Sequence, residues 1–112
     1  IGPFVVGPAV QRKLGLSAMS QIAIDANTFY SAEWAKNKGL FTEVYETTEA
    51  LDEAVIAFAE NLCTYNQKAM VEMKTMFWRG TEDWDQLLIQ RAKISGRLVL
   101  SDFTKDKLQG YK

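Results

Sequence analysis

The chain has 112 residues, of which 47% are hydrophobic and 24% are charged. This composition predicts one soluble globular unit with a single core, and it excludes collagen-like repeats and a flexible partner-binding tail. Thirteen Lys and Arg against 14 Asp and Glu leave a formal charge of −1. We therefore expect neither a nucleic-acid partner nor an anionic-membrane partner.

The chain contains no histidine, and Cys63 is its single cysteine. These counts exclude Ser-His-Asp and Cys-His nucleophiles, imidazole zinc sites, CxxC metal sites and an intramolecular disulfide. Because Cys63 lies beside an apolar stripe, we expect an inert core thiol. A reducing cytoplasm is the expected location, and no metal site is expected.

The longest apolar runs, residues 4–6 and 98–100, are far shorter than the roughly 20 residues of a membrane-spanning helix. No leader segment is visible at the start. The chain begins at Ile1 and its first methionine is Met19. We therefore expect a piece of a longer protein.

Glycine and proline divide the first quarter of the chain. Their spacing predicts a short extended or turn segment at residues 4–6, followed by a helix with Pro8 in its first turn. Gly15 is expected to end that helix. A second helix is then predicted over residues 17–25, with Ser17 as its N-cap.

The next predicted helix lies between Ser31, a suitable N-cap, and Gly39, a suitable left-handed stop. Residues 40–45 alternate with β-branched and aromatic side chains, which predicts a short strand or an extended arm. The fold class is therefore mainly α, with short extended segments near residues 4–6 and 40–45, in one domain over residues 1–112.

The rest of the chain is predicted to be helical. An apolar stripe indicates a helix of about four turns, and its members are Leu51, Val55, Phe58 and Leu62. Three further helices are expected to begin at polar caps, namely Asn66, Thr81 and Thr104. The second of these four helices should end at Gly80.

Residue clusters that resemble binding sites have simpler structural explanations. The glycine-rich opening lacks the Lys-Ser/Thr of a phosphate loop, and its prolines remove amide donors. Glu82, Asp83 and Asp85 complement a helix dipole and cannot converge on one metal ion. The methionines at positions 70, 73 and 76 indicate a packing surface.

Large aromatic side chains are frequent for so small a helical unit, which buries only part of its surface alone. We expect some of them to lie against another chain or a missing half. They are Phe29, Tyr30, Trp34, Phe77, Trp78, Trp84, Phe103 and Tyr111.

Two spaced motifs resemble the C-terminal part of the crotonase superfamily, the enoyl-CoA hydratase/isomerase enzymes. The first is an Arg-x-x-Gly at Arg12 and Gly15. The second consists of Ser31-Ala32, Ala35, Gly39-Leu40 and Val44. Residues 2–10 and 94–101, with Trp78, Gly80, Thr81 and Trp84, resemble one hydratase-like subgroup. The resemblance runs essentially from residue 1 to residue 112.

The resemblance implies a parent more than twice this length, with an N-terminal spiral of β–β–α turns and these C-terminal helices. Such enzymes bind acyl-CoA thioesters and assemble as trimers or hexamers. Two backbone N–H groups hold the thioester oxygen, and glutamates move the proton or add water. These groups lie upstream, so no catalytic residue is expected in this chain, and coenzyme A enters only as part of the substrate.

The substrate-binding residues implied by the resemblance are peripheral. Gly2, Pro3 and Phe4 would form a wall of the acyl pocket. Tyr111 matches an aromatic residue that precedes a CoA-contacting lysine in many relatives, and Lys112 is a neighbour of that position. The fragment itself is expected to be inactive and to serve in self-association and in covering the CoA site.

The expected parent reaction is hydration of a 2-enoyl-CoA. Enoyl-CoA isomerisation and hydration of a methylglutaconyl-CoA are alternatives, because the residues that separate these reactions lie upstream. A different alternative is a stand-alone helical protein-interaction module with no enzymatic parent.

Overall fold

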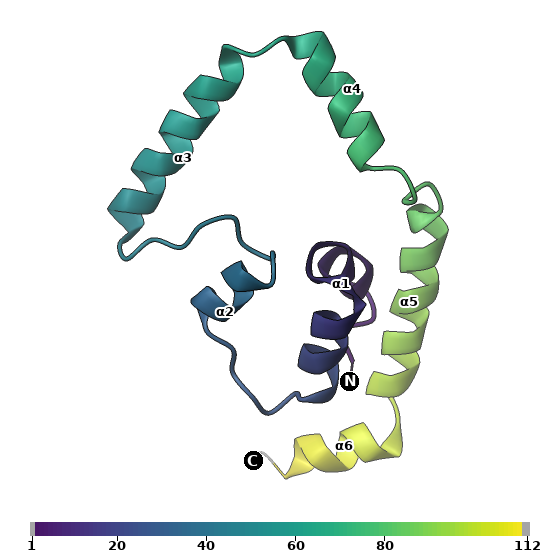
Figure 1. The fold of residues 1–112 in the computed structure, drawn as a ribbon. Coiled ribbons are helices and arrows are strands. Elements are labelled where there is room, and N and C mark those ends of the chain that lie inside the picture. Colours follow the sequence, from purple (N-terminus) through teal and green to yellow (C-terminus); the bar gives the residue numbers. More distant parts are fainter. Residues whose placement is uncertain (1, 111–112) are drawn as a thin grey trace. The chain divides into compact units, whose positions relative to one another are not determined.

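The computed structural model describes residues 2–110, and Figure 1 shows its fold. Helices alternate with short connections along this stretch, and no β-strand occurs in it. The helices are α1 (Gly7–Ile24), α2 (Ala32–Asn37), α3 (Thr48–Cys63), α4 (Gln67–Phe77), α5 (Trp84–Val99) and α6 (Asp102–Gln109). The expectation of a mainly α chain is confirmed.

The chain divides into two compact units. One unit contains α1, α2, α5 and α6, from the residues up to 41 and those from 83 onward. The other unit, residues 42–82, contains α3 and α4.

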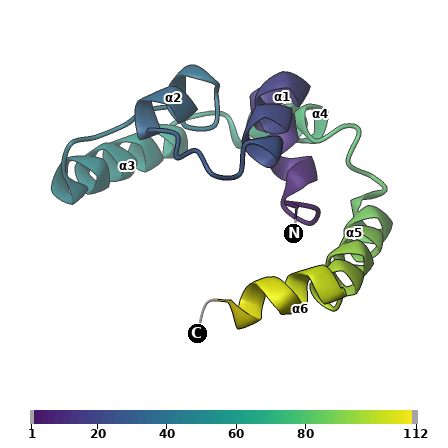
Figure 2. The same cartoon turned by 90° about the horizontal axis from the view of Figure 1, so that it is seen from below.

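Helix α1 consists of two helical segments joined at Gly15, whose φ of 75° and ψ of 166° are not helical. Only glycine adopts this backbone conformation readily, so the expected interruption at Gly15 is confirmed. The two segments run in different directions (Figures 1 and 2). Helix resumes directly after Gly15, so Ser17 lies inside the second segment and does not precede it.

The bend in α1 creates the buried part of its unit. A Cβ atom placed on Gly7 would lie 3.6 Å from the Cε of Met19. Twelve residues of a straight helix rise about 18 Å, so this contact depends on the bend. Leu14, Ala18 and Met19 are buried around it, at 9%, 5% and 7% exposure.

The start of α2 is fixed by its predicted cap. The Ser31 hydroxyl accepts a hydrogen bond of 3.0 Å from the Trp34 backbone N–H. The rings of Tyr30 and Trp34 lie against each other with centroids 4.3 Å apart. The loop that enters α2 is thereby attached to the first turn of the helix.

The end of α2 is a Schellman motif. The Leu40 N–H donates to the Ala35 carbonyl at 2.9 Å, and the Gly39 N–H donates to the Lys36 carbonyl, also at 2.9 Å. Gly39 has a φ of 85°, as this motif requires. Ala35 is the buried residue of α2, with 7% exposure.

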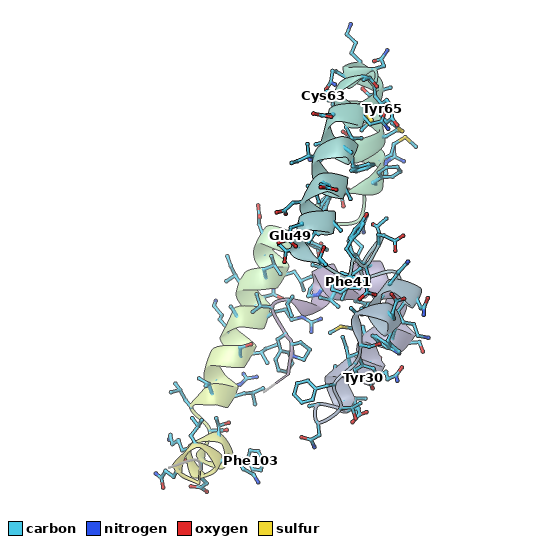
Figure 3. The ribbon with its side chains drawn as sticks, turned by 90° about the vertical axis from the view of Figure 1, so that its left-hand side faces the viewer. Tyr30, Phe41, Glu49, Cys63, Tyr65 and Phe103 are labelled. Carbon is cyan, nitrogen blue, oxygen red and sulfur yellow. The ribbon has the colours of Figure 1, made fainter. Side chains whose placement is uncertain are left out.

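Local hydrogen bonds also define α3 and α4. Thr47 accepts a bond of 3.1 Å from Ala50, and Asn66 accepts one of 3.1 Å from Ala69, which confirms Asn66 as the predicted cap. Figure 3 labels Tyr65 at the junction of the two helices, where its hydroxyl accepts a 2.8 Å bond from Asn61. Neither helix contains a buried residue.

Two predicted caps are wrong. Thr81 does not cap α5, because its hydroxyl donates backward to the Trp78 carbonyl at 2.7 Å, and α5 begins after Asp83. Thr104 does not cap α6. Ser101 does so instead, accepting a 3.4 Å bond from the Thr104 N–H. Thr81 precedes the N-cap position of α5 by two residues, and Thr104 follows the N-cap position of α6 by three.

Residues 4–6 were expected to be extended or a turn, and residues 40–45 a short strand or an extended arm; neither segment forms a strand. Residues 4–6 form a turn, and residues 41–46 are irregular. A strand needs a neighbour to pair with its backbone N–H and C=O groups, and residues 2–110 provide none. Cys63 is also corrected: its thiol is exposed and does not lie in a core (Figure 3).

Within residues 2–110, none of the helices combines the length and the apolar character that crossing a membrane requires.

Candidate functional site

The three predicted acyl-wall residues form a compact turn ahead of α1. The Phe4 N–H donates to the Gly2 carbonyl at 2.9 Å, and the Gly7 N–H donates to the Pro3 carbonyl at 2.8 Å. A Cβ on Gly2 would lie 3.1 Å from Cε2 of the Phe4 ring, so the ring folds back over this glycine. All three are half-buried.

The structure therefore brings Gly2, Pro3 and Phe4 together as one surface. The other two predicted substrate-binding residues, Tyr111 and Lys112, lie outside the described residues. Val5 and Val6 extend the turn with apolar side chains that are 45% and 54% exposed. Such a surface can contact an apolar group, but it supplies no side-chain acid, base or nucleophile.

The turn rests on α1 through Gly7. A Cβ added to this glycine would lie 3.6 Å from the Cε of Met19, which is an ordinary van der Waals distance. Met19 is almost fully buried. The burial of Met19 does not follow from periodicity, and the signal for it is the Gly15 break between the two halves of an otherwise helical stretch.

A polar cluster joins the end of α1 to the start of α2. The Tyr30 hydroxyl donates to the Asp25 carboxylate at 3.1 Å. Partial burial is the main cause that raises the pKa of the Tyr30 phenol above its ordinary value, and the hydrogen bond and charge of Asp25 raise it further. A hydrogen bond with Gln21 lowers this pKa. The cluster fixes the connection between the helices.

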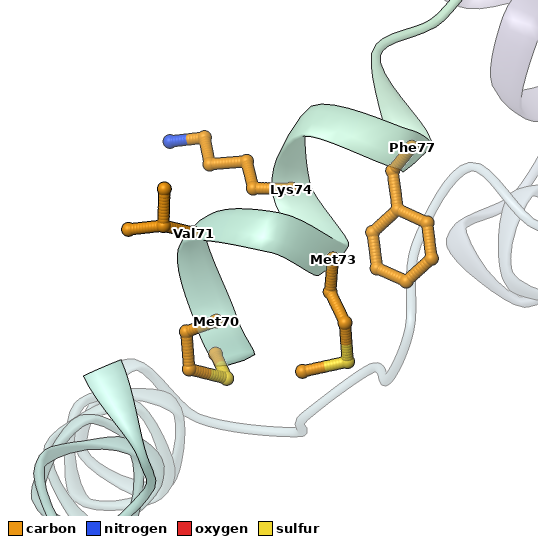
Figure 4. A pocket seen from close by; sticks show the side chains of 5 residues that line it. All are labelled: Met70, Val71, Met73, Lys74 and Phe77. Atoms are coloured by element: carbon orange, nitrogen blue, oxygen red, sulfur yellow. The ribbon is translucent and has the colours of Figure 1, made fainter. Parts of the chain in front are cut away.

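An open hollow lies along one face of α4 (Figure 4). It has a volume of about 330 Å³. Its lining consists of Met70, Val71, Met73, Lys74 and Phe77. Met73 is 41% exposed and Val71 is 64% exposed, so the predicted methionine packing surface is open on this chain.

Among residues 2–110, no group of three or more Cys, Asp and Glu side chains is arranged to hold a metal ion. The acidic residues before α5 interact with nearby backbone. The Glu82 carboxylate accepts a 3.1 Å hydrogen bond from the Gly80 N–H. Asp83 stands at the N-terminal boundary of α5, and Asp85 lies in its first turn. Carboxylates at these positions favour the positive end of the helix dipole.

Comparison with known proteins adds no assignment: no protein-family model, no curated protein and no solved structure matches the chain.

Proposed function

We propose that the chain is the helical C-terminal region of an enoyl-CoA hydratase/isomerase-type enzyme of the crotonase superfamily. In that enzyme the region self-associates and covers the CoA site. The parent hydrates a 2-enoyl-CoA thioester, and its oxyanion-hole donors and glutamates lie upstream. The proposal rests on the spaced motifs of the sequence and on what their residues do in the fold.

The observation that carries the proposal is that the motif residues occupy backbone positions with strict requirements. Gly15 and Gly39 have φ values of 75° and 85°, which disfavour every side chain. Ser31 caps α2, and Ala35 is buried at 7% exposure. Each motif residue is thus one that the local structure needs at its place.

The motif residues also meet in space, which supports treating them as one unit. A Cβ on Gly39 would lie 3.4 Å from the backbone carbonyl of Lys13. The end of α2 therefore approaches α1 between the Arg12 and Gly15 positions of the first motif. Glycine allows this close approach of two backbones, because it places no side chain between them.

The proposed self-association is supported by the exposed apolar side chains. Val55 and Phe58 on α3 are 56% and 62% exposed, and Leu100 between α5 and α6 is 69% exposed. Phe103 is 73% exposed and its ring projects from α6 (Figure 3). Clusters of exposed apolar groups mark surfaces that bind other protein. The same observation favours the second candidate, a stand-alone helical interaction module.

In the proposed enzyme this chain supplies binding surface and no proton transfer. The turn at Gly2, Pro3 and Phe4 lines the acyl chain beside the reacting carbon. Upstream amide donors stabilise the enolate that forms when a glutamate directs water at the double bond. This division explains why a chain without histidine can belong to an enzyme that performs acid–base chemistry.

The test begins with the gene and the intact mass of the natural protein. We expect the reading frame to continue upstream and to encode a protein of more than twice 12.7 kDa. It should encode a glutamate a few residues before Ile1. The full protein should hydrate a short 2-enoyl-CoA. A panel with a 3-enoyl-CoA and a methylglutaconyl-CoA separates hydratase, isomerase and branched-chain activity.

A start codon close to Ile1, or a full-length protein that acts on none of these thioesters, would overturn the enzyme proposal and favour the interaction module. Light scattering tests the assembly separately. We expect a trimer or a hexamer of the full protein, and a monomer at high micromolar concentration would contradict self-association.

A further inference from the structure

Helices α3 and α4 carry apolar stripes that their own unit leaves open. Both helices lie wholly within the described residues, and neither contains a buried residue. Val55 and Phe58 of α3 and Val71 and Phe77 of α4 are each more than half exposed. The two helices diverge from their junction and do not pack along their lengths (Figure 1). Open apolar stripes of this kind mark surfaces that bind other protein.

The junction between the two helices is held by its own hydrogen bonds. The Thr64 hydroxyl donates to the Asn61 carbonyl at 2.7 Å, and the Asn61 amide donates to the Tyr65 hydroxyl at 2.8 Å. Asn66 then caps α4 by accepting from the Ala69 N–H at 3.1 Å. Folding α4 back onto α3 in the same chain would require these bonds to rearrange, which favours a cover from another molecule.

The two helices differ in charge, and the difference indicates what that cover is. Helix α3 has a net charge of −4, whereas the whole chain has −1, because its charged residues are Glu49, Asp52, Glu53 and Glu60. Residues 67–79 have a net charge of +2, from Lys68, Lys74 and Arg79 against Glu72. An acidic amphipathic helix therefore complements α4, and α3 of a second copy is such a helix.

Single charged residues lie beside both apolar stripes. Lys74 lines the hollow on α4 together with Met73 and Phe77 (Figure 4). Asp52 precedes Val55 by three residues, so it lies at the edge of the same face of α3. Antiparallel pairing places the N-terminal half of α3 against the C-terminal half of α4, which brings Asp52 to Lys74. The flexible methionine side chains adapt to the apolar groups that enter.

We propose that the hollow of α4 binds the apolar stripe of α3 from a second copy of this chain. The two helices pair antiparallel, with an ion pair between Asp52 of one copy and Lys74 of the other. Because the two surfaces differ, the contacts connect copies head to tail and form a ring where the rotation between copies closes. This inference rests on the proposed self-association and names its surfaces, and it is independent of the reaction catalysed.

Sedimentation of the full-length protein at several concentrations measures the association. Lys74→Glu and Asp52→Lys should each weaken it about tenfold, because each places like charges together. The double variant carries the reversed ion pair and should recover most of the wild-type association. Lys68→Glu is the matched control, since it makes the same charge change on α4 outside the lining of the hollow. All three residues are exposed, so the variants retain the fold.

A second measurement identifies the occupant of the hollow. Isotopically labelled and unlabelled full-length proteins are mixed, allowed to exchange subunits and treated with a carbodiimide, which joins a lysine amine to a neighbouring carboxylate. We expect cross-links between Lys74 and Asp52 that join a labelled peptide to an unlabelled one. Cross-links confined to one chain, or from Lys74 to a carboxylate upstream of Ile1, would overturn the docking. The cover would then be the same chain's α3 or its upstream half.

Self-association and docking fail in different ways. A wild-type protein that stays monomeric at high micromolar concentration overturns the self-association, and the docking with it. An oligomer whose association is unchanged by Lys74→Glu and by Asp52→Lys overturns the docking alone. Equal weakening by Lys68→Glu and Lys74→Glu also overturns it, because net charge and not the hollow would then be the cause.

Discussion

The α1–α2 pair and the α3–α4 pair both contain helices that begin at side-chain caps, but they differ in what the helices bury. Side-chain oxygens of Ser31, Thr47 and Asn66 cap α2, α3 and α4 at distances of 3.0 to 3.1 Å. Leu14 and Met19 of α1 and Ala35 of α2 are buried, whereas neither α3 nor α4 contains a buried residue. Local signals therefore specify helices in both regions, and only the first region stabilises them by packing.

The comparison also separates two kinds of glycine. Gly15 and Gly39 hold backbone conformations that shape the α1–α2 region. Gly96 lies inside α5 with no atom within 4 Å of an added Cβ. The first two glycines are required by the structure, whereas the third only weakens its helix.

The largest expected effect comes from emptying the buried part of α1. Leu14→Ala should lower the free energy of unfolding by about 3 kcal/mol, through lost burial and the cavity left behind. Phe58→Ala on α3 should cost less than about 1 kcal/mol, because Phe58 is 62% exposed. Urea unfolding followed by tryptophan fluorescence gives both values.

A Phe58→Ala variant as costly as Leu14→Ala would mean that α3 is covered in the folded protein. That result would remove the contrast between the two regions and would locate an interface on α3. The same measurement at several protein concentrations would then show whether the cover is a second copy, since only an intermolecular contact depends on concentration.

The next effect is strain at the end of α2. Gly39→Ala should cost about 1 to 2 kcal/mol, because φ is 85° and the new Cβ would approach the Lys13 carbonyl at 3.4 Å. Gly96→Ala is the control and should stabilise by about 0.5 to 1 kcal/mol, since alanine favours a helix interior. Equal effects of the two substitutions in urea unfolding would contradict the Schellman geometry at Gly39.

Removing a helix cap should lower stability by less than these substitutions do. The set of helices whose amide exchange accelerates should also differ between the two regions. Ser31→Ala and Thr47→Ala should each cost about 1 kcal/mol of helix stability. With no buried side chain to hold α3, Thr47→Ala should accelerate amide exchange along α3 and leave α1 unchanged. Ser31→Ala should accelerate exchange in both α1 and α2, because Gly39 at the end of α2 approaches the Lys13 carbonyl of α1.

The control for the caps is Thr75→Ala. Thr75 lies inside α4 and its hydroxyl donates to the Val71 carbonyl at 3.0 Å, so its removal should leave stability nearly unchanged. If Thr47→Ala also accelerates exchange in α1, the two regions unfold together and the comparison does not hold.

The smallest effect concerns Tyr30 at alkaline pH. Its pKa is raised in the folded protein, chiefly by partial burial. The folded state therefore retains the phenol proton longer than the unfolded state, and the stability gained is present below the ordinary tyrosine pKa of about 10. That stability is lost as pH rises through the raised value. Tyr30→Phe should flatten this alkaline decline in thermal unfolding, whereas Tyr45→Phe, the control, should not.

Sequence patterns predicted the elements that depend on neighbouring residues. The cap at Ser31, the stop at Gly39, the cap at Asn66 and the break at Gly15 each follow from a residue and its own backbone. Thr81 and Thr104 were assigned wrongly for a related reason. Each lies within three residues of another polar residue at which the helix begins, Asp83 for α5 and Ser101 for α6.

Patterns failed where a distant segment decides the outcome. Alternation at residues 40–45 is typical of a short strand or an extended arm, and no strand forms because pairing needs a second strand that the described residues do not contain. Cys63 was assigned to a core because it adjoins an apolar stripe, yet nothing in its unit covers that side of α3. The candidate site shows the same limit, since the proximity of Gly2 to Phe4 was implied but the support from Met19 was not.

Local propensity and composition are enough to predict the helical class and several helix ends, and to exclude histidine, intramolecular disulfide and CxxC chemistry. Tertiary structure decided which apolar side chains are buried and what holds the N-terminal turn. Those outcomes depend on the bend at Gly15, which brings Gly7 and Met19 together across twelve residues. Periodicity along the chain reports which face of a helix is apolar, but only folding determines what that face meets.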